Sequence, residues 1–153
     1  MKNKSASIFS SMTPIHNHDG VIFYKEHYVP YQLVALKEGV IWRNDLITFW
    51  GKTYPQPRLT AWHGDPGVEY KYSNIKMISP GWTPLLKSIR DQLEVDLNVS
   101  FNSVLVNLYR DGNDHMSYHA DDEKSLGLNP TIASLSFGAT RKFLLKHRYK
   151  KEV

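Results

Sequence analysis

Two residues near position 120 have the types and the spacing to bind one metal ion. His119 and Asp121 are separated by a single alanine. On an extended segment, side chains two positions apart project to the same face, so an imidazole nitrogen and a carboxylate oxygen can reach one cation. Non-haem Fe(II) sites use two histidines and one carboxylate and leave other coordination positions open. The pair predicts two-thirds of such a site, although His-x-Asp in an acidic stretch is also typical of an exposed, hydrated turn.

The elements that must position this pair are mostly β-strands. A helix is expected over 84–97, because Thr83 can cap it, Pro84 fits its first position, and leucine and isoleucine recur at helical spacing. The apolar stripe of this helix must lie on a sheet. Segments rich in β-branched and aromatic residues, separated by turn signals, predict strands over 101–109, 117–121, 131–137 and 142–147. We therefore expect a mainly β (α+β) fold with antiparallel strands, such as a jelly roll, which protects its strand edges.

The N-terminal half predicts shorter elements. Residues 1–20 are polar and aperiodic and are expected to form a loose N-terminal segment, followed by a single domain over 21–153. After the turn signal at 64–67, a strand should return as the second half of a hairpin. The expected elements are a strand over 21–24, a helix over 31–37 entered through Pro30, irregular or edge strands over 46–62, and the returning strand over 68–72.

Length and composition limit the class of protein. With 153 residues, 41% of them hydrophobic and 22% charged, the chain has the composition of one soluble globular domain. It has no cysteine, which excludes a thiolate nucleophile, a cysteine zinc site and an iron–sulfur cluster. No apolar run reaches the roughly 18 residues that cross a bilayer, and the first residues lack a secretion signal. We expect no membrane partner and a cytoplasmic location, associated with the nucleoid if the source is bacterial.

The formal charge of the chain is concentrated at its end. Residues 1–140 carry 13 Lys and Arg against 14 Asp and Glu, a net charge of −1, whereas residues 141–153 carry six against one, a net charge of +5. Clustered basic side chains favour a polyanion, because binding releases its counterions. The segment therefore indicates a nucleic-acid partner. The alternative is a solvated strand face that runs into a frayed basic tail.

Several longer stretches match one known family in order and spacing. They are Pro57-Arg58-Leu59-Thr60 with Gly64-Asp65, Tyr70-Lys71-Tyr72-Ser73, Phe101 to Gly112, His119 to Glu123, and Ile132 to Ala139. Over roughly three-fifths of the chain, from about residue 57 to residue 147, the sequence resembles the AlkB-type Fe(II)/2-oxoglutarate dioxygenases. It is most similar to the branch that repairs alkylated DNA bases.

This resemblance implies the fold and the metal site. The family fold is a double-stranded β-helix, or jelly roll, with supporting N-terminal helices. Carried over to this sequence, His119 and Asp121 are catalytic ligands of Fe(II). Asn107 and Tyr109 supply an amide and a phenol to the co-substrate 2-oxoglutarate. The implied reaction uses dioxygen to oxidise an N-alkyl carbon of a flipped base, forming succinate and CO2 and releasing an aldehyde.

The resemblance also implies which residues bind the substrate. Tyr72 corresponds to an aromatic ring that stacks on the flipped base. Asp122 and Glu123 correspond to an acidic pair that accepts hydrogen bonds from an exocyclic amine or orders the loop. Arg58 corresponds to a residue that lines the base pocket or contacts the nucleic acid. The alternatives are tyrosines that pack in the core or at its rim, and an Arg58 that forms a surface ion pair.

The sequence departs from the family pattern after Asp121. A second ligating histidine and an Arg-x-Asn-x-Thr-x-Arg-like strand are absent, and His147 is not assigned to iron. We therefore expect a C-terminally incomplete member that lacks closing strands and binds iron and 2-oxoglutarate weakly. A truncated chain, an interrupted reading frame and a split protein with a complementing C-terminal fragment all remain open. So do a catalytically inactive nucleic-acid-binding remnant and the same chemistry on RNA or on protein.

Overall fold

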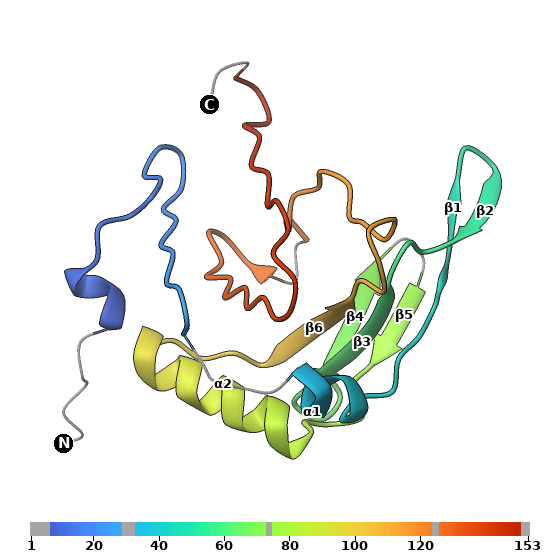
Figure 1. Cartoon of the computed structure of the whole chain (residues 1–153), viewed down its shortest axis with the longest axis horizontal. Coiled ribbons are helices and arrows are strands. Elements are labelled where there is room, and N and C mark those ends of the chain that lie inside the picture. The colour runs from blue at the N-terminus through green and yellow to red at the C-terminus, as the bar shows by residue number, and fades with distance from the viewer. Residues whose placement is uncertain (1–6, 29–32, 73–74, 124–125, 151–153) are drawn as a thin grey trace.

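Short strands, two α-helices and a short 3-10 helix make up the regular structure of the described residues. The computed structural model describes residues 7–28, 33–72, 75–123 and 126–150, and it describes the backbone alone at Phe49, Tyr70, Lys71, Tyr72 and Ile75. The elements are η1 (Ile8–Ser11), α1 (Leu33–Glu38), β1 (Leu46–Phe49), β2 (Lys52–Pro55), β3 (Leu59–Gly64), β4 (Glu69–Tyr72), β5 (Ile75–Ile78), α2 (Pro84–Leu97) and β6 (Ser103–Leu108). The fold is mainly β with few helices, as predicted (Figure 1).

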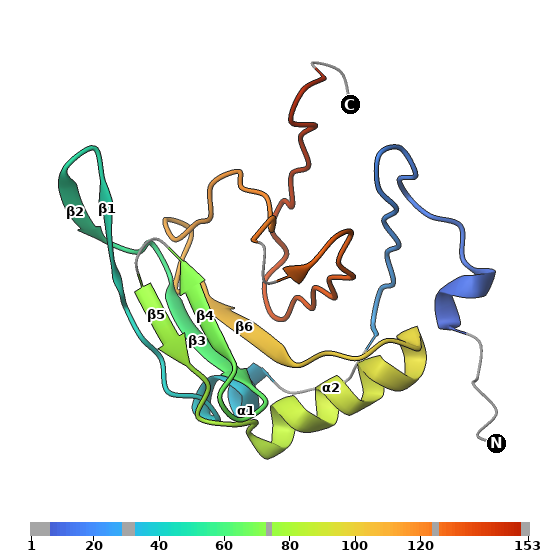
Figure 2. The same ribbon diagram turned by 180° about the vertical axis from the view of Figure 1, so that it is seen from behind.

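The strands form three antiparallel pairs, β1 with β2, β3 with β6, and β4 with β5. The hairpin of β1 and β2 projects from the rest of the molecule in both views (Figures 1 and 2). The prediction that 68–72 returns against the preceding strand is wrong, because β4 pairs with β5 and β3 pairs with the distant β6. The apolar β6 gives β3 a partner that buries side chains against α2, which a local hairpin does not provide.

Helix α2 confirms the prediction over 84–97 and carries the core. The Thr83 hydroxyl accepts a hydrogen bond from the backbone N–H of Leu86 at 3.2 Å, which satisfies one of the unpaired donors at the helix start. Leu86 and Ile89 are buried, and Val104 and Val106 of β6 pack against them. The apolar stripe of the helix therefore lies on the pair of β3 and β6, as expected.

The pairing of β3 with β6 gives this two-stranded sheet two different faces. Val104 and Val106 point toward α2, so Asn107 must point to the opposite face, because side chains alternate along a strand. Thr60 is the direct cross-strand partner of Asn107, and directly opposed side chains project to the same side. The face away from α2 therefore carries Thr60 and Asn107.

The strands predicted over 117–121, 131–137 and 142–147 are not formed. Residues 109–123 and 126–150 consist of turns and irregular chain, which lies inside the curve formed by α2 and the sheets (Figures 1 and 2). Residues 131–137 still keep a period of two, because Leu135 and Phe137 are half-buried against the α2 core while Ser134 and Ser136 are exposed. Apolar alternation selects the buried face, but a strand also needs a partner for its backbone hydrogen bonds.

The N-terminal elements are shorter than predicted. The strand expected over 21–24 is reduced to an isolated bridge between Ile22 and His16. The helix expected over 31–37 appears as α1, and the predicted start at residues 30–32 lies outside the described residues. Of the helices in the described ranges, none is long and apolar enough to cross a membrane.

Candidate functional site

His119 and Asp121 place their side chains beside each other. His119 Nε2 lies 3.4 Å from Asp121 Oδ1, and each side chain is a little under half exposed. The other ring nitrogen, Nδ1, lies 2.9 Å from the carbonyl oxygen of Ser117. A carbonyl only accepts hydrogen bonds, so Nδ1 carries a proton, and whenever the ring is neutral the lone pair of Nε2 lies on the side of the carboxylate. Two electron-pair donors that face each other form a receptor for a cation.

This donor set fits Fe(II). An imidazole nitrogen and a carboxylate oxygen are two of the three protein ligands in a two-histidine, one-carboxylate site. A ring N–H donated to a backbone carbonyl is the usual contact that orients a metal-binding histidine. No group of three or more His, Asp or Glu side chains in the described ranges is arranged to hold a metal ion. The pair could supply two protein ligands to such a metal, which would leave several coordination positions for small molecules.

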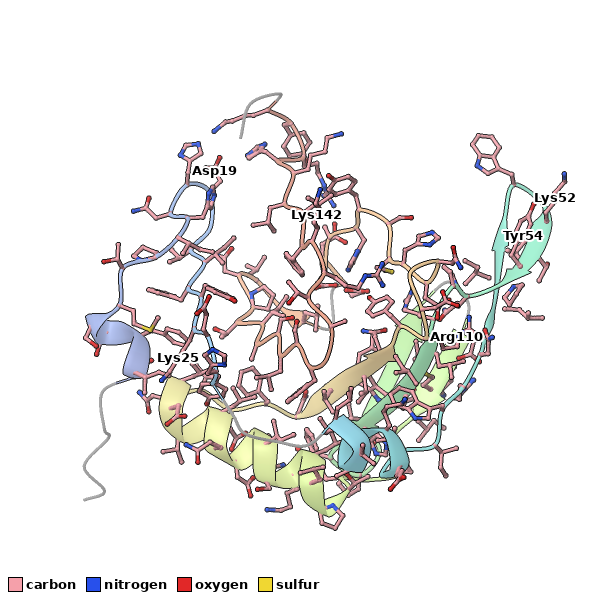
Figure 3. All side chains as sticks on the ribbon, viewed as in Figure 1. Asp19, Lys25, Lys52, Tyr54, Arg110 and Lys142 are labelled. Carbon is pink, nitrogen blue, oxygen red and sulfur yellow. The ribbon has the colours of Figure 1, made fainter. Side chains whose placement is uncertain are left out.

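His147 belongs to a separate cluster, which it forms with Asp19 of the N-terminal loop. Its Nε2 lies 3.1 Å from Asp19 Oδ2, and its Nδ1 accepts hydrogen bonds from the backbone N–H groups of Tyr149 and Lys150. With Nδ1 occupied as an acceptor, the proton of the neutral ring is on Nε2 and is donated to Asp19. Figure 3 shows Asp19 on the N-terminal loop that faces the C-terminal segment. This arrangement gives His147 a structural partner.

Arg58 fixes the orientation of the Asn107 amide. Arg58 is 6% exposed, and its Nε donates a hydrogen bond to Asn107 Oδ1 at 2.9 Å. Because a guanidinium only donates, the amide oxygen must face Arg58, and Nδ2 of Asn107 is the donor left for a ligand. The alternative of a surface ion pair for Arg58 is wrong, since the side chain is buried and its hydrogen-bonded partner is an amide.

Thr60 is a site residue that the sequence analysis missed. It lies directly opposite Asn107 and is 3% exposed. Its hydroxyl oxygen is buried and makes no hydrogen bond within the described part of the chain. A buried hydroxyl without a partner costs about 1–3 kcal/mol, a cost that a bound ligand can remove. The signal available in the sequence was its position two residues after Arg58, on the same strand face.

Tyr109 lies beneath a guanidinium group from the C-terminal segment. Arg141 stands over its ring at 5.2 Å from the centroid, and Arg141 Nη1 donates to the backbone carbonyl of Asp114 at 2.8 Å. The Asp114 carboxylate accepts hydrogen bonds from Arg110 N, Nε and Nη2. These contacts with Arg110 lower the pKa of Asp114 to about 2. The sequence indicates Arg141 only as part of the basic segment over 141–153.

The remaining predicted residues lie in three different settings. Asp122 Oδ2 accepts a hydrogen bond from Arg148 Nη2 at 2.6 Å, and this partner lowers the pKa of Asp122. Glu123 is half-buried, and its backbone carbonyl accepts from the N–H of Leu126. Tyr72 is the last residue of β4, and its side chain lies outside the described part of the molecule.

Four of the predicted site residues therefore lie in two separate pairs. One group is Arg58 with Asn107 on the sheet face, and the other is His119 with Asp121 in the following loop. Across the part of the chain that the structure describes, no hydrogen bond or ion pair joins one group to the other. The basic segment contacts residues near both, since Arg141 lies on Tyr109 and Arg148 binds Asp122.

Comparison with known proteins identifies the family of the chain. Residues 31–153 match the family model described as the 2OG-Fe(II) oxygenase superfamily. The chain therefore belongs to the 2OG-Fe(II) oxygenase superfamily.

Its relatives define the branch. The chain is 45% identical over 117 residues to the mouse alpha-ketoglutarate-dependent dioxygenase alkB homolog 3, a match that covers 76% of the chain and 40% of the relative. It is 50% identical over 97 residues to the human protein of that name, covering 63% and 33%. It is 40% identical over 102 residues to the cattle DNA oxidative demethylase ALKBH2, covering 67% and 37%. Within the superfamily the chain is of the AlkB type, and it spans between a third and two-fifths of the length of these relatives.

Proposed function

We propose that this chain carries part of the active site of an oxidative DNA repair enzyme that removes alkyl groups from N-alkylated bases. The observation that carries the proposal is the pairing of His119 Nε2 with Asp121 Oδ1 at 3.4 Å, with Nδ1 tied to a backbone carbonyl. This is the arrangement that a divalent metal requires of its ligands. Membership in the 2OG-Fe(II) oxygenase superfamily supports Fe(II) as the metal.

His119 and Asp121 would hold Fe(II), and Asn107 and Tyr109 would contact 2-oxoglutarate. When bound, Fe(II) with 2-oxoglutarate and dioxygen supplies the oxidation of the N-alkyl carbon. The part of the chain is to hold and orient the reactants. Asn107 offers Nδ2 as a donor because Arg58 occupies its oxygen, and Tyr109 offers a phenolic O–H. Both donors suit a ligand rich in carboxylate and keto oxygens.

Alkylated DNA is the substrate we propose. The names of the cattle and human ALKBH2 relatives describe DNA oxidative demethylases, which supports this choice. Tyr72 would stack on a flipped base, Asp122 and Glu123 would accept hydrogen bonds from it, and Arg58 would line its pocket. The +5 charge of residues 141–153 would add contacts with phosphates.

The jelly roll would be closed by further strands. Residues 131–137 already alternate between half-buried and exposed side chains, which suits a strand awaiting a partner. A complementing C-terminal fragment would supply that partner, together with another metal ligand and a second arginine. We place the protein in the cytoplasm, and on the nucleoid if its source is bacterial.

Succinate formation tests the proposal. The chain, supplied with Fe(II), 2-oxoglutarate and N-methylated single-stranded DNA, should produce succinate and demethylated base. His119→Ala and Asp121→Ala should abolish both products. His115→Ala is a matched control, because His115 is also exposed and its Nδ1 also binds the carbonyl two residues earlier, yet it forms no ion pair with a carboxylate among the described residues. Full activity of His119→Ala would refute the assignment.

A second candidate is a catalytically inactive nucleic-acid-binding protein. The observation that favours it is that the described residues supply only two of the three expected metal ligands. DNA binding with a steep salt dependence and no succinate would establish this alternative. Parallel assays on methylated duplex DNA, RNA and a methylated peptide identify the substrate class, and equal activity on the peptide would overturn the choice of DNA.

A further inference from the structure

The basic C-terminal segment lies along the loop that carries His119 and Asp121. Three of its cationic side chains contact that loop, and their partners follow in the same order, so residues 141–148 run in the same direction as residues 114–122. The contacts are Arg141 Nη1 with the Asp114 carbonyl at 2.8 Å, Lys146 Nζ over the Tyr118 ring at 5.8 Å from its centroid, and Arg148 Nη2 with Asp122 Oδ2 at 2.6 Å. The last of these contacts places a cation on the residue that follows the proposed metal ligands.

Two carboxylates of the chain bind two cations near the end of this segment. Arg148 pairs with Asp122, and Lys150 Nζ donates to Asp19 Oδ2 at 2.8 Å. Both cations are therefore paired within the chain and are not free for phosphates. Asp122 is affected as well, because one of the oxygens that would accept a hydrogen bond from a base already accepts one from Arg148. The chain thus holds a proposed phosphate-binding group and a proposed base-binding group against each other.

The ion pair of Arg148 with Asp122 can be exchanged readily. Its two side chains are 56% and 62% exposed, and ion pairs as exposed as this contribute little to folding stability. A phosphate group presents several oxygens to the planar fork of a guanidinium and forms a charge-assisted, bidentate contact with it. Along a nucleic acid such contacts also release counterions, which favours the exchange. A polyanion can therefore take Arg148 from Asp122 without disrupting the fold.

The departure of Arg148 changes the charge beside the metal pair. Asp122 directly follows Asp121, and its negative charge is offset as long as the guanidinium of Arg148 is bound to it. Once Arg148 moves to a phosphate, this carboxylate is no longer compensated. A negative charge at such short range stabilises a divalent cation by Coulomb attraction, most strongly at low ionic strength. The coupling is reciprocal, so a bound cation should also favour the complex with nucleic acid.

We propose that the ion pair of Arg148 with Asp122 is a switch that couples nucleic-acid binding to metal binding. In the free chain the pair is closed, and the affinity of His119 and Asp121 for a divalent metal is lowered. A nucleic acid binds Arg148, frees Asp122 and raises this affinity. The inference rests on the proposed function, which supplies the metal site and the polyanion. It adds a mode of regulation in which the substrate class promotes loading of the metal.

Titration with Mn(II) tests the coupling without relying on turnover. The full chain is titrated at low ionic strength, alone and with a short single-stranded DNA oligonucleotide, and free Mn(II) is measured by electron paramagnetic resonance. Without DNA, Arg148→Gln should bind Mn(II) roughly three- to tenfold more tightly than the wild type, because Asp122 is already unpaired. The oligonucleotide should tighten binding by a similar factor in the wild type and add little in Arg148→Gln.

Two further variants are the controls. Asp122→Asn keeps Arg148 but removes the carboxylate, so the oligonucleotide should tighten its binding of Mn(II) much less than that of the wild type. Lys142→Gln removes the same charge from the same segment, and Lys142, labelled in Figure 3, forms no ion pair within the described ranges. Without DNA, Lys142→Gln should therefore bind Mn(II) like the wild type.

The outcomes separate this proposal from the proposed function. Equal affinity of the wild type and Arg148→Gln for Mn(II) without DNA would overturn the proposal, since the ion pair would then not act on the metal. Equal tightening by DNA in the wild type and Asp122→Asn would also overturn it, because the general field of the DNA would then be the cause. In both cases the metal site of the proposed function would stand. If the wild-type chain binds no Mn(II) with or without DNA, that metal site fails as well.

Discussion

Substitutions of Asn107 can separate the contribution of this side chain to folding stability from its proposed contribution to ligand binding. Its oxygen accepts a 2.9 Å hydrogen bond from Arg58, which is 6% exposed, and its nitrogen is the donor that we propose for the ligand. Asn107→Ala removes the acceptor and leaves a buried cationic donor unpaired, at a cost of about 1.5–3 kcal/mol. For a chain of this size the unfolding midpoint should fall by roughly 3–12 °C. Asn107→Asp keeps an oxygen facing Arg58, so its stability should equal or exceed that of the wild type.

Both variants should nevertheless lose affinity for 2-oxoglutarate. Neither has the amide nitrogen, and the aspartate also turns a negative charge toward an anionic ligand, so binding should weaken by at least about tenfold in each. Urea denaturation followed by the fluorescence of the four tryptophans measures stability, and calorimetry with Mn(II) measures binding. If Asn107→Asp unfolds as readily as Asn107→Ala, Arg58 is not held by this oxygen. If it binds 2-oxoglutarate like the wild type, the amide is not the donor.

Three further predictions concern the fold that holds the site. Leu86→Ala, in the buried core beneath β6, should lower the free energy of unfolding by about 2–4 kcal/mol in urea titrations, and a loss below 1 kcal/mol would mean that the core is not packed there. Because Arg110 lowers the pKa of Asp114 from 3.8 to about 2, Asp114 should stabilise the folded state above about pH 4, and this contribution should disappear as the pH falls toward 2. Urea midpoints measured across this range should show a shallower decline for Asp114→Asn, and identical profiles would contradict the ion pair. Trp50 has a φ of 52° in the two-residue turn between β1 and β2, so Trp50→Asn should raise the free energy of unfolding by about 0.5–1 kcal/mol, whereas a decrease would show that the contacts of the indole outweigh the strain.

The parts of the fold that depend on local signals could be predicted from the sequence. The cap at Thr83, the proline at the first position and the apolar spacing define α2 within its own residues. Likewise, β6 is an apolar run bounded by turns. The strand over 131–137 has an equally good pattern, yet its formation depends on a partner strand elsewhere in the chain. Pairing between distant segments, such as β3 with β6, cannot be predicted from the sequence of either segment alone.

The residues of the candidate site also differ in whether local sequence is enough to predict them. His119 and Asp121 could be recognised because their relation depends only on a spacing of two residues. The places of Thr60 and Arg141 could not, because each lies beside a predicted site residue that is far away in sequence. Thr60 matters through the register that sets it opposite Asn107, and Arg141 through the return of the chain over Tyr109.

The alternation in residues 131–137 has a consequence for how a further strand would pair with this segment. Leu135 and Phe137 have already selected their buried face, so an incoming strand would not have to sort the side chains and would mainly supply main-chain donors and acceptors. Pairing of this kind depends little on the amino-acid sequence of the added strand. It depends strongly on the length of that strand and on how extended it is. The amide protons of this segment should therefore exchange rapidly with solvent deuterium in the isolated chain and become protected once a neighbour is seated.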